Sequence, residues 1–310
     1  MRLWRASRRT RFVQWLSQVS EWEREHSCMK RIDAEVVGDF WPLGGKVVSG
    51  GQFVAGKTLE QWQAKLCVEG ASMAENAWVG SEDWGKLVGV SDGAVLVNEA
   101  GERLAWTGDG SGPGILVGAS SFLVLYPWDI IRVNEQIVGG LEEEVTLGEV
   151  SAAAHIEGVV HVGEGTRILP GVFIEGNAVI GAGCKIGPNC YIRGNTAIGD
   201  GVHIGQAVEV KNSVIGHGSS VGHLSYVGDS VLGDKVNFGA ATVTSNLRHD
   251  GCNHRSLVAG RLMETGRRKF GTIVGDGVHT GIHTAIYPGR KLGAGTSTRP
   301  NESVETDKLD

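Results

Sequence analysis

The sequence predicts a mainly β fold class: a left-handed parallel β-helix over residues 151–300, preceded by a small α+β domain. An aliphatic residue recurs at every sixth position, ten times in succession. Neither a helix, with 3.6 residues per turn, nor a strand, with a period of two, produces this spacing, whereas a coil of three short strands does. Glycine makes up 48 of 310 residues and often follows the aliphatic position, where a tight corner needs it. The ten positions are Ile156, Val162, Ile168, Ile174, Ile180, Ile186, Ile192, Ile198, Ile204 and Val210.

The repeat is irregular at three places. A step of five residues separates Val210 from Ile215, and the ladder slips again before Leu232. The period stops after Thr244 and returns at Val274, which predicts an inserted loop over residues 245–273. Because imperfections in a regular pattern tend to mark functional sites, we expect the chemistry to lie near these steps.

Composition limits the class of protein. The net charge of −6 and the pI of about 5.9 argue against a nucleic-acid partner. No apolar run reaches the roughly 18 residues that span a bilayer, so we expect no stable membrane insertion. The five cysteines include no CxxC pair, which predicts reduced thiols and a cytoplasmic location. Cys184 and Cys190 fit buried repeat positions rather than metal ligands.

The front of the chain has a different character, since all nine tryptophans lie between Trp4 and Trp128. Residues 1–28 are basic, and they suggest either an amphipathic helix on an anionic membrane or a disordered extension. We expect a small α+β domain over residues 29–125, a connector over 126–150 and a tail over 301–310. The expected strands are 46–48, 93–97, 115–117 and 122–125, and the expected helix is 58–67.

Two cations occupy equivalent positions on successive coils. Arg193 and Lys211 are eighteen residues apart, which is one coil, so they should stack about 4.8 Å from each other. Either a phosphate binds between them, or each is neutralised by a neighbour such as Glu209. His223 follows the first short step and either accepts a proton from an amine or hydrogen-bonds a neighbouring coil.

Five motifs follow one another in the second half of the chain. They are Val208-Glu-Val-Lys-Asn-Ser-Val-Ile-Gly, Gly222-His-Leu-Ser-Tyr-Val-Gly-Asp, Val236-Asn-Phe-Gly-Ala-Ala-Thr, Ser245-Asn-Leu-Arg-His-Asp-Gly and Thr265-Gly-Arg-Arg-Lys-Phe-Gly-Thr-Ile-Val-Gly-Asp. The first three resemble the acetyltransferase domain of the bifunctional glucosamine-1-phosphate acetyltransferase/N-acetylglucosamine-1-phosphate uridyltransferase family. The last two more closely resemble its archaeal-type sugar-1-phosphate nucleotidylyltransferase/acetyltransferases. The resemblance covers residues 150–300, about half of the chain.

This resemblance implies roles for the matching residues. His223 would be the general base that acts on the 2-amino group of an amino-sugar 1-phosphate. Arg193 and Lys211 would hold the phosphate, Tyr226 and Asn237 would contact the sugar, and Asn246 would orient the amine.

The resemblance also implies acetyl-CoA as co-substrate, a homotrimer with sites between subunits, and no metal. Gly239 and Ala240 would lie near the thioester, whose carbonyl backbone N–H groups polarise. Arg267, Arg268 and Lys269 would contact substrate or coenzyme phosphates, unless they form a solvated basic loop.

The sequence departs from the family at three points. The family's Gly-Ala-Gly-Thr reads Gly239-Ala240-Ala241-Thr242, and the places of two archaeal-type lysines look like Cys252 and Arg255. The front of the chain lacks a Gly-rich loop with Gly-Thr-Arg, so we interpret residues 29–125 as a reduced or replaced nucleotidyltransferase domain.

Two rival motifs point to other chemistry. The segment from Gly51 to Thr58 matches the phosphate-loop pattern GxxxxGK[ST] and suggests nucleotide binding, with a plain loop and helix as the alternative. A zinc enzyme on a β-helix needs three converging histidines, but His217 and His223 are six apart and should diverge on successive faces.

These observations predict an acetyl-CoA-dependent N-acetyltransferase acting on glucosamine 1-phosphate or galactosamine 1-phosphate in UDP-sugar biosynthesis. Ala241, Cys252 and the replaced front domain keep two alternatives open. One is a non-catalytic β-helix that binds a sugar phosphate or scaffolds a partner. The other is a sugar-1-phosphate nucleotidyltransferase-like protein.

Overall fold

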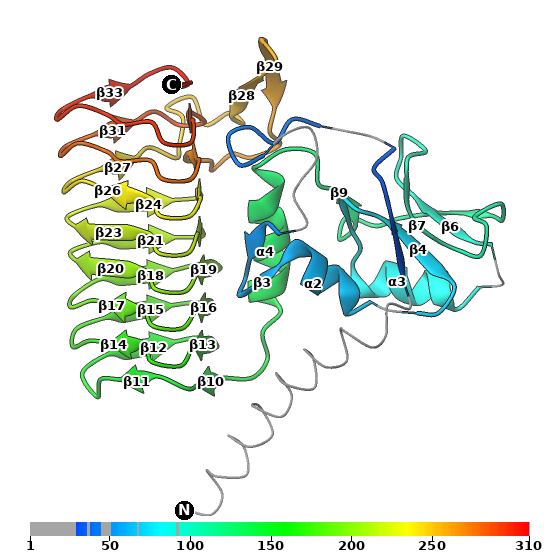
Figure 1. The fold of residues 1–310 in the computed structure, drawn as a ribbon, viewed down its shortest axis with the longest axis horizontal. Helices are drawn as coiled ribbons and strands as arrows, with labels where there is room; N and C mark the ends of the chain where they lie inside the picture. The colour runs from blue at the N-terminus through cyan, green and yellow to red at the C-terminus, as the bar shows by residue number, and fades with distance from the viewer. Residues whose placement is uncertain (1–28, 36–37, 45–50, 67, 91–92, 310) are drawn as a thin grey trace, which may run out of the picture. The chain divides into compact units, whose positions relative to one another are not determined.

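The computed structural model describes residues 29–35, 38–44, 51–66, 68–90 and 93–309 (Figure 1). The chain divides into two compact units. The described residues up to 35 and those of 59–123 form the first unit, and those of 38–58 and 124–309 form the second. In the described parts of the chain, no helix has the length and apolar character needed to cross a membrane.

The first unit is a small α+β domain. Its main sheet has the order β1-β4-β7-β6-β8, with antiparallel pairs in the centre and a parallel pair at each edge. The expected helix and three of the expected strands are present, whereas residues 46–48 lie outside the described residues. The elements are β1 Lys30–Ile32, α2 Leu59–Ala64, β4 Ala71–Ala74, β5 Ala77–Trp78, α3 Ser81–Val88, β6 Val95–Val97, β7 Arg103–Thr107, β8 Gly114–Leu116 and β9 Phe122–Leu123.

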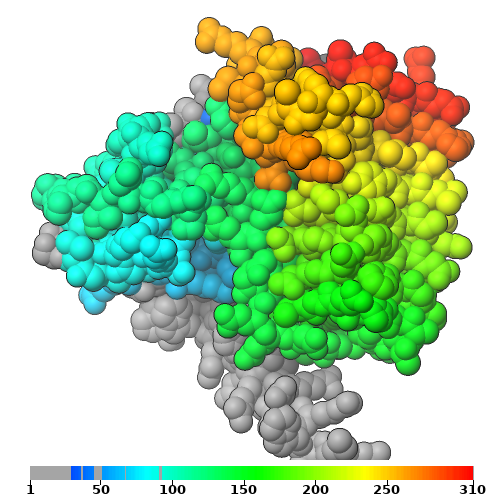
Figure 2. Space-filling view, turned by 180° about the vertical axis from the view of Figure 1, so that it is seen from behind, coloured from blue at the N-terminus to red at the C-terminus, as the bar shows by residue number. Residues whose placement is uncertain are grey.

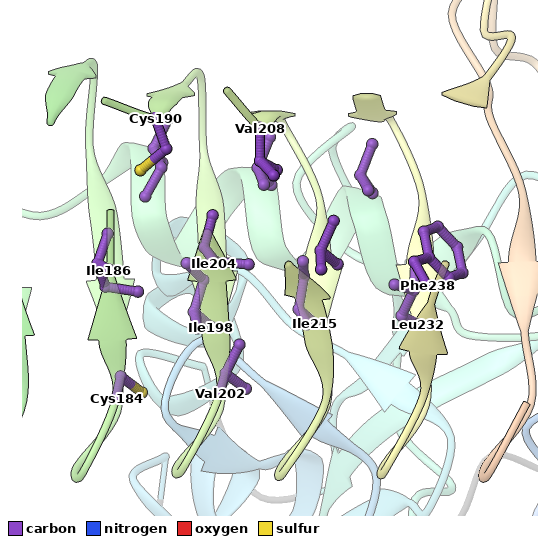
Figure 3. Close-up of a cluster of buried hydrophobic side chains, with 14 of the residues drawn as sticks. Cys184, Ile186, Cys190, Ile198, Val202, Ile204, Val208, Ile215, Leu232 and Phe238 are labelled. Atoms are coloured by element: carbon purple, nitrogen blue, oxygen red, sulfur yellow. The ribbon is translucent and has the colours of Figure 1, made fainter. Parts of the chain in front are cut away.

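The second unit contains a left-handed parallel β-helix, as predicted. Three sheets of parallel strands form its faces, and the strand residues stack on their register partners one coil earlier. One inward column, for example, runs through Ile174, Ile192 and Val210. The aliphatic residues at the six-residue spacing fill the core, together with the buried free thiols of Cys184 and Cys190 (Figure 3).

Over residues 145–244, successive strands along the chain belong to the first, second and third sheet in turn. The first sheet contains β10 Val145–Thr146, β13 Val160–Val162, β16 Ala178–Ile180, β19 Thr196–Ile198, β22 Val214–Ile215, β25 Val231–Leu232, β30 Ile273–Val274 and β32 Lys291–Leu292. The second sheet contains β11 Glu149–Val150, β14 Arg167–Ile168, β17 Lys185–Ile186, β20 His203–Gln206, β23 Ser220–His223 and β26 Asn237–Phe238. The third sheet contains β12 His155–Glu157, β15 Phe173–Glu175, β18 Tyr191–Arg193, β21 Glu209–Lys211, β24 Tyr226–Gly228, β27 Val243–Thr244, β31 Ala285–Ile286 and β33 Ser303–Val304.

The ends of the β-helix differ from the predicted ones. The first coil begins at β10 and the last strand is β33, so residues 145–150 and 303–304 belong to the helix rather than to the connector and tail. Val150 lies six residues before Ile156 and is the register partner of the buried Ile168, so it continues the repeat, although its own side chain is exposed in this first coil. The predicted insertion contains an antiparallel hairpin of β28 Arg255–Val258 and β29 Arg261–Glu264, which forms a raised lobe over the coils (Figure 2).

The predicted connector contains a helix, α4 Asp129–Gly139, whose apolar side packs on the first sheet. Asparagine side chains fix this contact. Asn134 Nδ2 donates to the carbonyl oxygen of Asn195 at 2.8 Å, and Asn177 Nδ2 donates to that of Val138 at 3.0 Å. Helix α4 therefore lies beside the corner that joins the third sheet to the first.

The phosphate-loop interpretation of Gly51 to Thr58 is wrong. Strands β2 Phe53–Val54 and β3 Lys57–Thr58 form an antiparallel hairpin instead. Ala55 and Gly56 have φ values of 48° and 84°, which is the geometry of a two-residue turn with positive φ at both positions. The predicted domain of residues 29–125 is thus not continuous, because this hairpin belongs to the second unit, where the Phe53 ring lies 4.7 Å from that of His217.

Asp129, at the start of α4, has an unusual protonation equilibrium. Its carboxylate accepts hydrogen bonds from the backbone N–H groups of Leu125 and Tyr126, both at 2.9 Å. Desolvation nevertheless raises its pKa to about 6. The folded state therefore holds this proton more tightly than the unfolded chain, whose aspartate pKa is about 3.9. The residue costs stability progressively as the pH rises from about 4 to about 6.

Replacement of Asp129 by asparagine should remove this pH dependence. We expect Asp129→Asn to match the wild type near pH 4 and to exceed its free energy of unfolding by about 1–3 kcal/mol at pH 7. Urea unfolding at both pH values measures the difference. The control Asp250→Asn should show the opposite trend, because Arg248 lowers the pKa of that carboxyl group. An Asp129→Asn variant with no gain at pH 7 would contradict the assignment.

One column of corner residues has a left-handed backbone conformation. Ala207, Leu224, Ala241, His283 and Asn301 all have φ values from 52° to 61°. Residues with a Cβ are strained in this region, and glycine is not. The replacement of the family's second glycine by Ala241 therefore introduces backbone strain.

Ala241→Gly should relieve that strain. We expect a gain of about 0.5–1 kcal/mol in the free energy of unfolding, measured with urea. Ala240→Gly is the matched control, since Ala240 has no positive φ and its replacement should destabilise the protein by a similar amount. Equal effects of the two substitutions would show that the corner is not strained.

Candidate active site

The predicted stack of two cations is present on the third sheet. Arg193 in β18 and Lys211 in β21 are register partners, and the next coil places Gly228 of β24 at the same position. The two charges do not depend on a shared anion, because each has its own carboxylate. Arg193 binds Glu209 at 2.7 Å, and the Lys211 ammonium binds Asp229 at 2.7 and 2.9 Å.

The two ion pairs differ in burial. The side chains of Arg193 and Glu209 are 35% and 33% exposed, whereas those of Lys211 and Asp229 are 19% and 2% exposed. An exposed pair is weak and exchanges readily, and a buried one is costly to break. Arg193 can therefore exchange Glu209 for a ligand, whereas Lys211 stays paired with Asp229.

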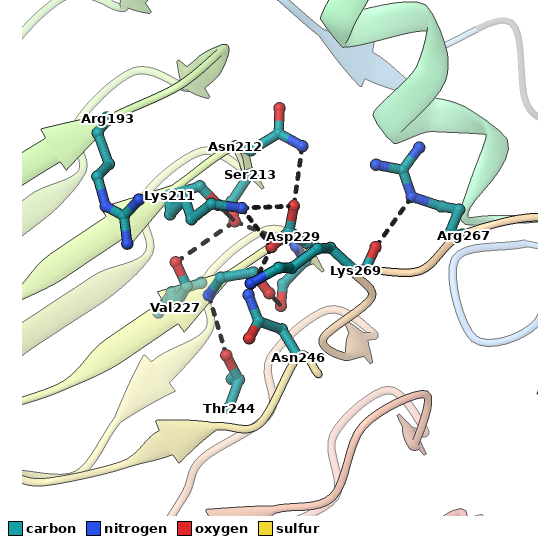
Figure 4. Close-up of polar contacts among 12 residues, drawn as sticks. Arg193, Lys211, Asn212, Ser213, Val227, Asp229, Thr244, Asn246, Arg267 and Lys269 are labelled. Carbon is teal, nitrogen blue, oxygen red and sulfur yellow. Dashed lines mark hydrogen bonds and ion pairs between the residues drawn. The ribbon is translucent and has the colours of Figure 1, made fainter. Parts of the chain in front are cut away.

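Asp229 is the centre of a polar network (Figure 4). Besides Lys211, its carboxylate accepts from Asn212 Nδ2 at 3.0 Å and from Asn246 Nδ2 at 2.5 Å. Asn246 Nδ2 also donates to the Tyr226 hydroxyl at 2.9 Å. The structure thus brings four predicted site residues, Arg193, Lys211, Tyr226 and Asn246, to one corner of the β-helix.

Sequence reasoning missed Asp229 and Asn212. They occupy a corner column that also contains Gly176 and Gly194, and all four residues have positive φ. Asparagine and aspartate tolerate this conformation better than other residues with a Cβ. The signal was present in the sequence, since both corners are the shortened steps before Ile215 and Leu232.

Gly228 makes room for the network. A Cβ on this residue would lie 2.3 Å from the Tyr226 hydroxyl oxygen and 2.8 Å from Asn246 Nδ2. Neither atom could keep its place against a methyl group. The interruption of the cation column at Gly228 is therefore what allows Tyr226 and Asn246 to meet.

The basic segment 267–269 contributes unequally. Arg267 forms an ion pair with Glu135 of α4, at 2.6 Å, and Glu135 also accepts from Asn212 Nδ2 at 2.7 Å. The Lys269 side chain extends toward Asp229 and Asn246 (Figure 4), and its ammonium has no ion pair with any described residue. Arg268 is exposed. Lys269 thus adds a positive charge beside the network, whereas the charge of Arg267 is already offset.

The remaining predicted residues lie along the adjacent corner and the second sheet. His223 ends β23 with an exposed side chain, and its carbonyl oxygen accepts from the Ala241 N–H at 3.1 Å. Asn237 is exposed in β26 and stacks on Ser220. The Gly239 N–H donates to Thr280 Oγ1 at 2.9 Å, so it is occupied, whereas the Ala240 N–H has no partner among the described residues.

A groove of about 490 Å³ lies on the third sheet and along the corner that precedes it. Leu224, next to His223, lines it together with Glu209 and Tyr226, and aromatic rings of earlier coils extend it. In the described portion of the chain, no three His, Cys, Asp or Glu side chains are placed to hold a metal ion.

Comparison with known proteins shows which sequences the β-helix is similar to. Two overlapping segments, residues 150–257 and 174–290, match the family described as the GMPPB C-terminal domain. A bifunctional sugar-1-phosphate nucleotidylyltransferase/acetyltransferase of Sulfurisphaera tokodaii is 44% identical over 181 residues, which are 58% of this chain and 45% of that protein. The bifunctional protein GlmU of Methanococcus aeolicus is 38% identical over 189 residues, which are 59% of this chain and 45% of that protein.

Among solved structures, the UDP-N-acetylglucosamine O-acyltransferase of Moraxella catarrhalis aligns with 50% of this chain and 64% of its own, at 15% identity and a TM-score of 0.30. The chain spans less than half the length of the two curated relatives. Within the aligned half, the β-helix is similar in sequence to part of these two proteins.

Proposed function

We propose that this protein is an acetyl-CoA-dependent N-acetyltransferase that acts on an amino-sugar 1-phosphate, glucosamine 1-phosphate or galactosamine 1-phosphate, in nucleotide-sugar biosynthesis. The observation that carries the proposal is the contact of Tyr226, which lines the groove, with Asn246 and with the charge of Arg193, while the exposed His223 ends the strand before Tyr226. The names of the homologous relatives, which include an acetyltransferase activity, support it.

The phosphate would bind to the cations that are free to exchange. Arg193 would leave Glu209, because that pair is partly exposed and a guanidinium binds phosphate through two parallel hydrogen bonds. Lys269 would add the second charge. Lys211 would act indirectly, by keeping Asp229 in place.

The amine of the sugar would attack the carbonyl carbon of the acetyl thioester. His223 would accept the proton that the amine loses, and the departing thiolate of coenzyme A would take up a proton as the carbon–sulfur bond breaks. The Ala240 N–H is the backbone donor available for the developing oxyanion, since the Gly239 N–H is bound to Thr280. No metal is required for these steps.

The protein would work as a cytoplasmic homotrimer with the groove at the subunit interface. Large apolar side chains are exposed at this corner, among them Leu224 (63%), Val243 (43%) and Ile282 (49%). Clustered exposed apolar residues are typical of interaction surfaces.

A second candidate function is non-catalytic binding of a sugar phosphate. The carboxylates that already offset Arg193, Lys211 and Arg267, and the strained Ala241, favour it. Calorimetry separates the two functions, because a non-catalytic protein would bind the sugar phosphate and not acetyl-CoA.

The activity itself is tested by release of free thiol from acetyl-CoA in the presence of each amino-sugar 1-phosphate. We expect turnover with at least one of them, and a decrease of about 100-fold or more in kcat for His223→Ala. His155→Ala, which removes an exposed histidine of the first coil, should leave turnover unchanged. Full activity of His223→Ala would exclude His223 as the base.

The phosphate contacts are tested by Arg193→Gln and Lys269→Gln. Each should raise the KM for the amino-sugar phosphate about tenfold and leave the KM for acetyl-CoA unchanged, because each removes one charge-assisted contact to phosphate. Lys185→Gln, an exposed lysine of β17 on the second sheet, is the control and should change neither constant. A rise in both constants for Lys269→Gln would instead place that lysine at the coenzyme.

A further inference from the structure

The hydrogen-bond network around Asp229 has a fixed direction. A carboxylate accepts hydrogen bonds and donates none. The three groups that contact this one, the Lys211 ammonium and the Nδ2 atoms of Asn212 and Asn246, are all donors. Because the Asp229 side chain is 2% exposed, water cannot easily replace any of them.

This direction determines how the Asn246 amide is oriented. Its Nδ2 must face Asp229, because the carbonyl oxygen of the amide would repel the carboxylate. The two hydrogens of Nδ2 are then used by Asp229 and by the Tyr226 hydroxyl oxygen. Asn246 Oδ1 has no hydrogen-bond partner among the described residues, so it is left as an acceptor.

The Tyr226 hydroxyl also has a defined direction in this network. Its hydroxyl oxygen accepts from Asn246, so its own hydrogen is free to be donated. Desolvation and the nearby Asp229 and Glu209 raise the pKa of Tyr226, so the hydroxyl keeps its hydrogen at neutral pH. Tyr226 also lines the groove, where a ligand reaches it.

We propose that Asp229 is a positioning and specificity-determining residue that fixes Asn246 as an acceptor and Tyr226 as a donor toward the substrate. The site then selects a sugar phosphate that presents an N–H or O–H to Asn246 and an oxygen atom to Tyr226. An amine beside a hydroxyl or phosphate oxygen meets both demands, and a substituent that can only accept hydrogen bonds does not. The inference rests on the proposed function, since it concerns the same sugar-phosphate site.

The test compares three ligands by calorimetry: glucosamine 1-phosphate, glucose 1-phosphate and 2-deoxy-2-fluoroglucose 1-phosphate. The last two have the same charge, but the hydroxyl can donate a hydrogen bond and the fluorine cannot. The wild type should bind the hydroxyl ligand about tenfold more tightly than the fluoro ligand, since an acceptor would otherwise face Asn246 Oδ1. In Asp229→Asn the amide of Asn246 is free to turn, so this ratio should fall to about one.

Three further variants separate the orienting effect of Asp229 from effects of its charge and of misfolding. Asp229→Asn/Lys211→Met removes the pair without changing the net charge and should also bring the ratio to about one. Asp234→Asn, at a neighbouring corner where the carboxylate accepts from the His217 N–H at 2.7 Å, should keep the wild-type ratio. Tyr226→Phe keeps the contact between Asp229 and Asn246, so it should weaken the binding of the hydroxyl and fluoro ligands by the same factor. If Asp229→Asn does not fold, Tyr226→Phe is the variant that tests the proposal.

The possible results are distinct. If the wild type binds none of the three ligands, the proposed function fails and this inference fails with it. If it binds glucosamine 1-phosphate but does not distinguish hydroxyl from fluorine, the function stands and the role of Asp229 is overturned. A wild-type ratio in the double variant, or loss of the ratio in Tyr226→Phe, would also overturn it.

Discussion

The parallel register of the coils is the constraint on which the rest of the structure depends. Each strand residue lies over its register partner one coil earlier, so a corner residue changes the surface without disturbing the aliphatic column inside. Along one corner the residues change from Gly194 to Asn212 to Asp229 while the backbone keeps positive φ. A structural corner thus acquires an amide and then a carboxylate, and the polar network is built at no cost to the core.

The charges of the site are largely arranged before any ligand arrives. Lys211 and Arg267 are held by Asp229 and Glu135, and both carboxylates also hold Asn212. Groups fixed in this way need little reorganisation when a substrate binds, which favours binding and catalysis. The more exposed pair of Arg193 with Glu209 is the part that exchanges, so the site combines a fixed interior with an adaptable edge.

The sequence predicted the features that follow the six-residue repeat and missed elements and contacts outside it. The six-residue spacing identified the buried columns, the stack of Arg193 on Lys211 and the insertion after Thr244. Helix α4 was missed because it is not part of the repeat and lies in the segment interpreted as a connector. The pairing of Glu135 with Arg267 joins residues 132 apart in sequence, and no local pattern encodes such a contact. The match to the phosphate-loop pattern was misleading for a different reason. A hairpin turn and a phosphate loop both use glycine, so the pattern alone does not distinguish them.

The inserted segment explains how residues so far apart in sequence form one site. Asn246 lies at its start and Lys269 near its end, and a bridge between Leu247 and Lys269 closes the base of the loop. The Asn246 carbonyl oxygen accepts from the Phe270 N–H at 3.0 Å and contacts His254 Nε2 at 3.1 Å, so the backbone on both sides of the loop is fixed. Glu135 then ties Arg267 to α4. Because the loop base is held by the scaffold, Asn246 and Lys269 have defined positions although they leave the regular coils. The rest of the insertion, including Cys252, can therefore vary without moving Asn246 and Lys269.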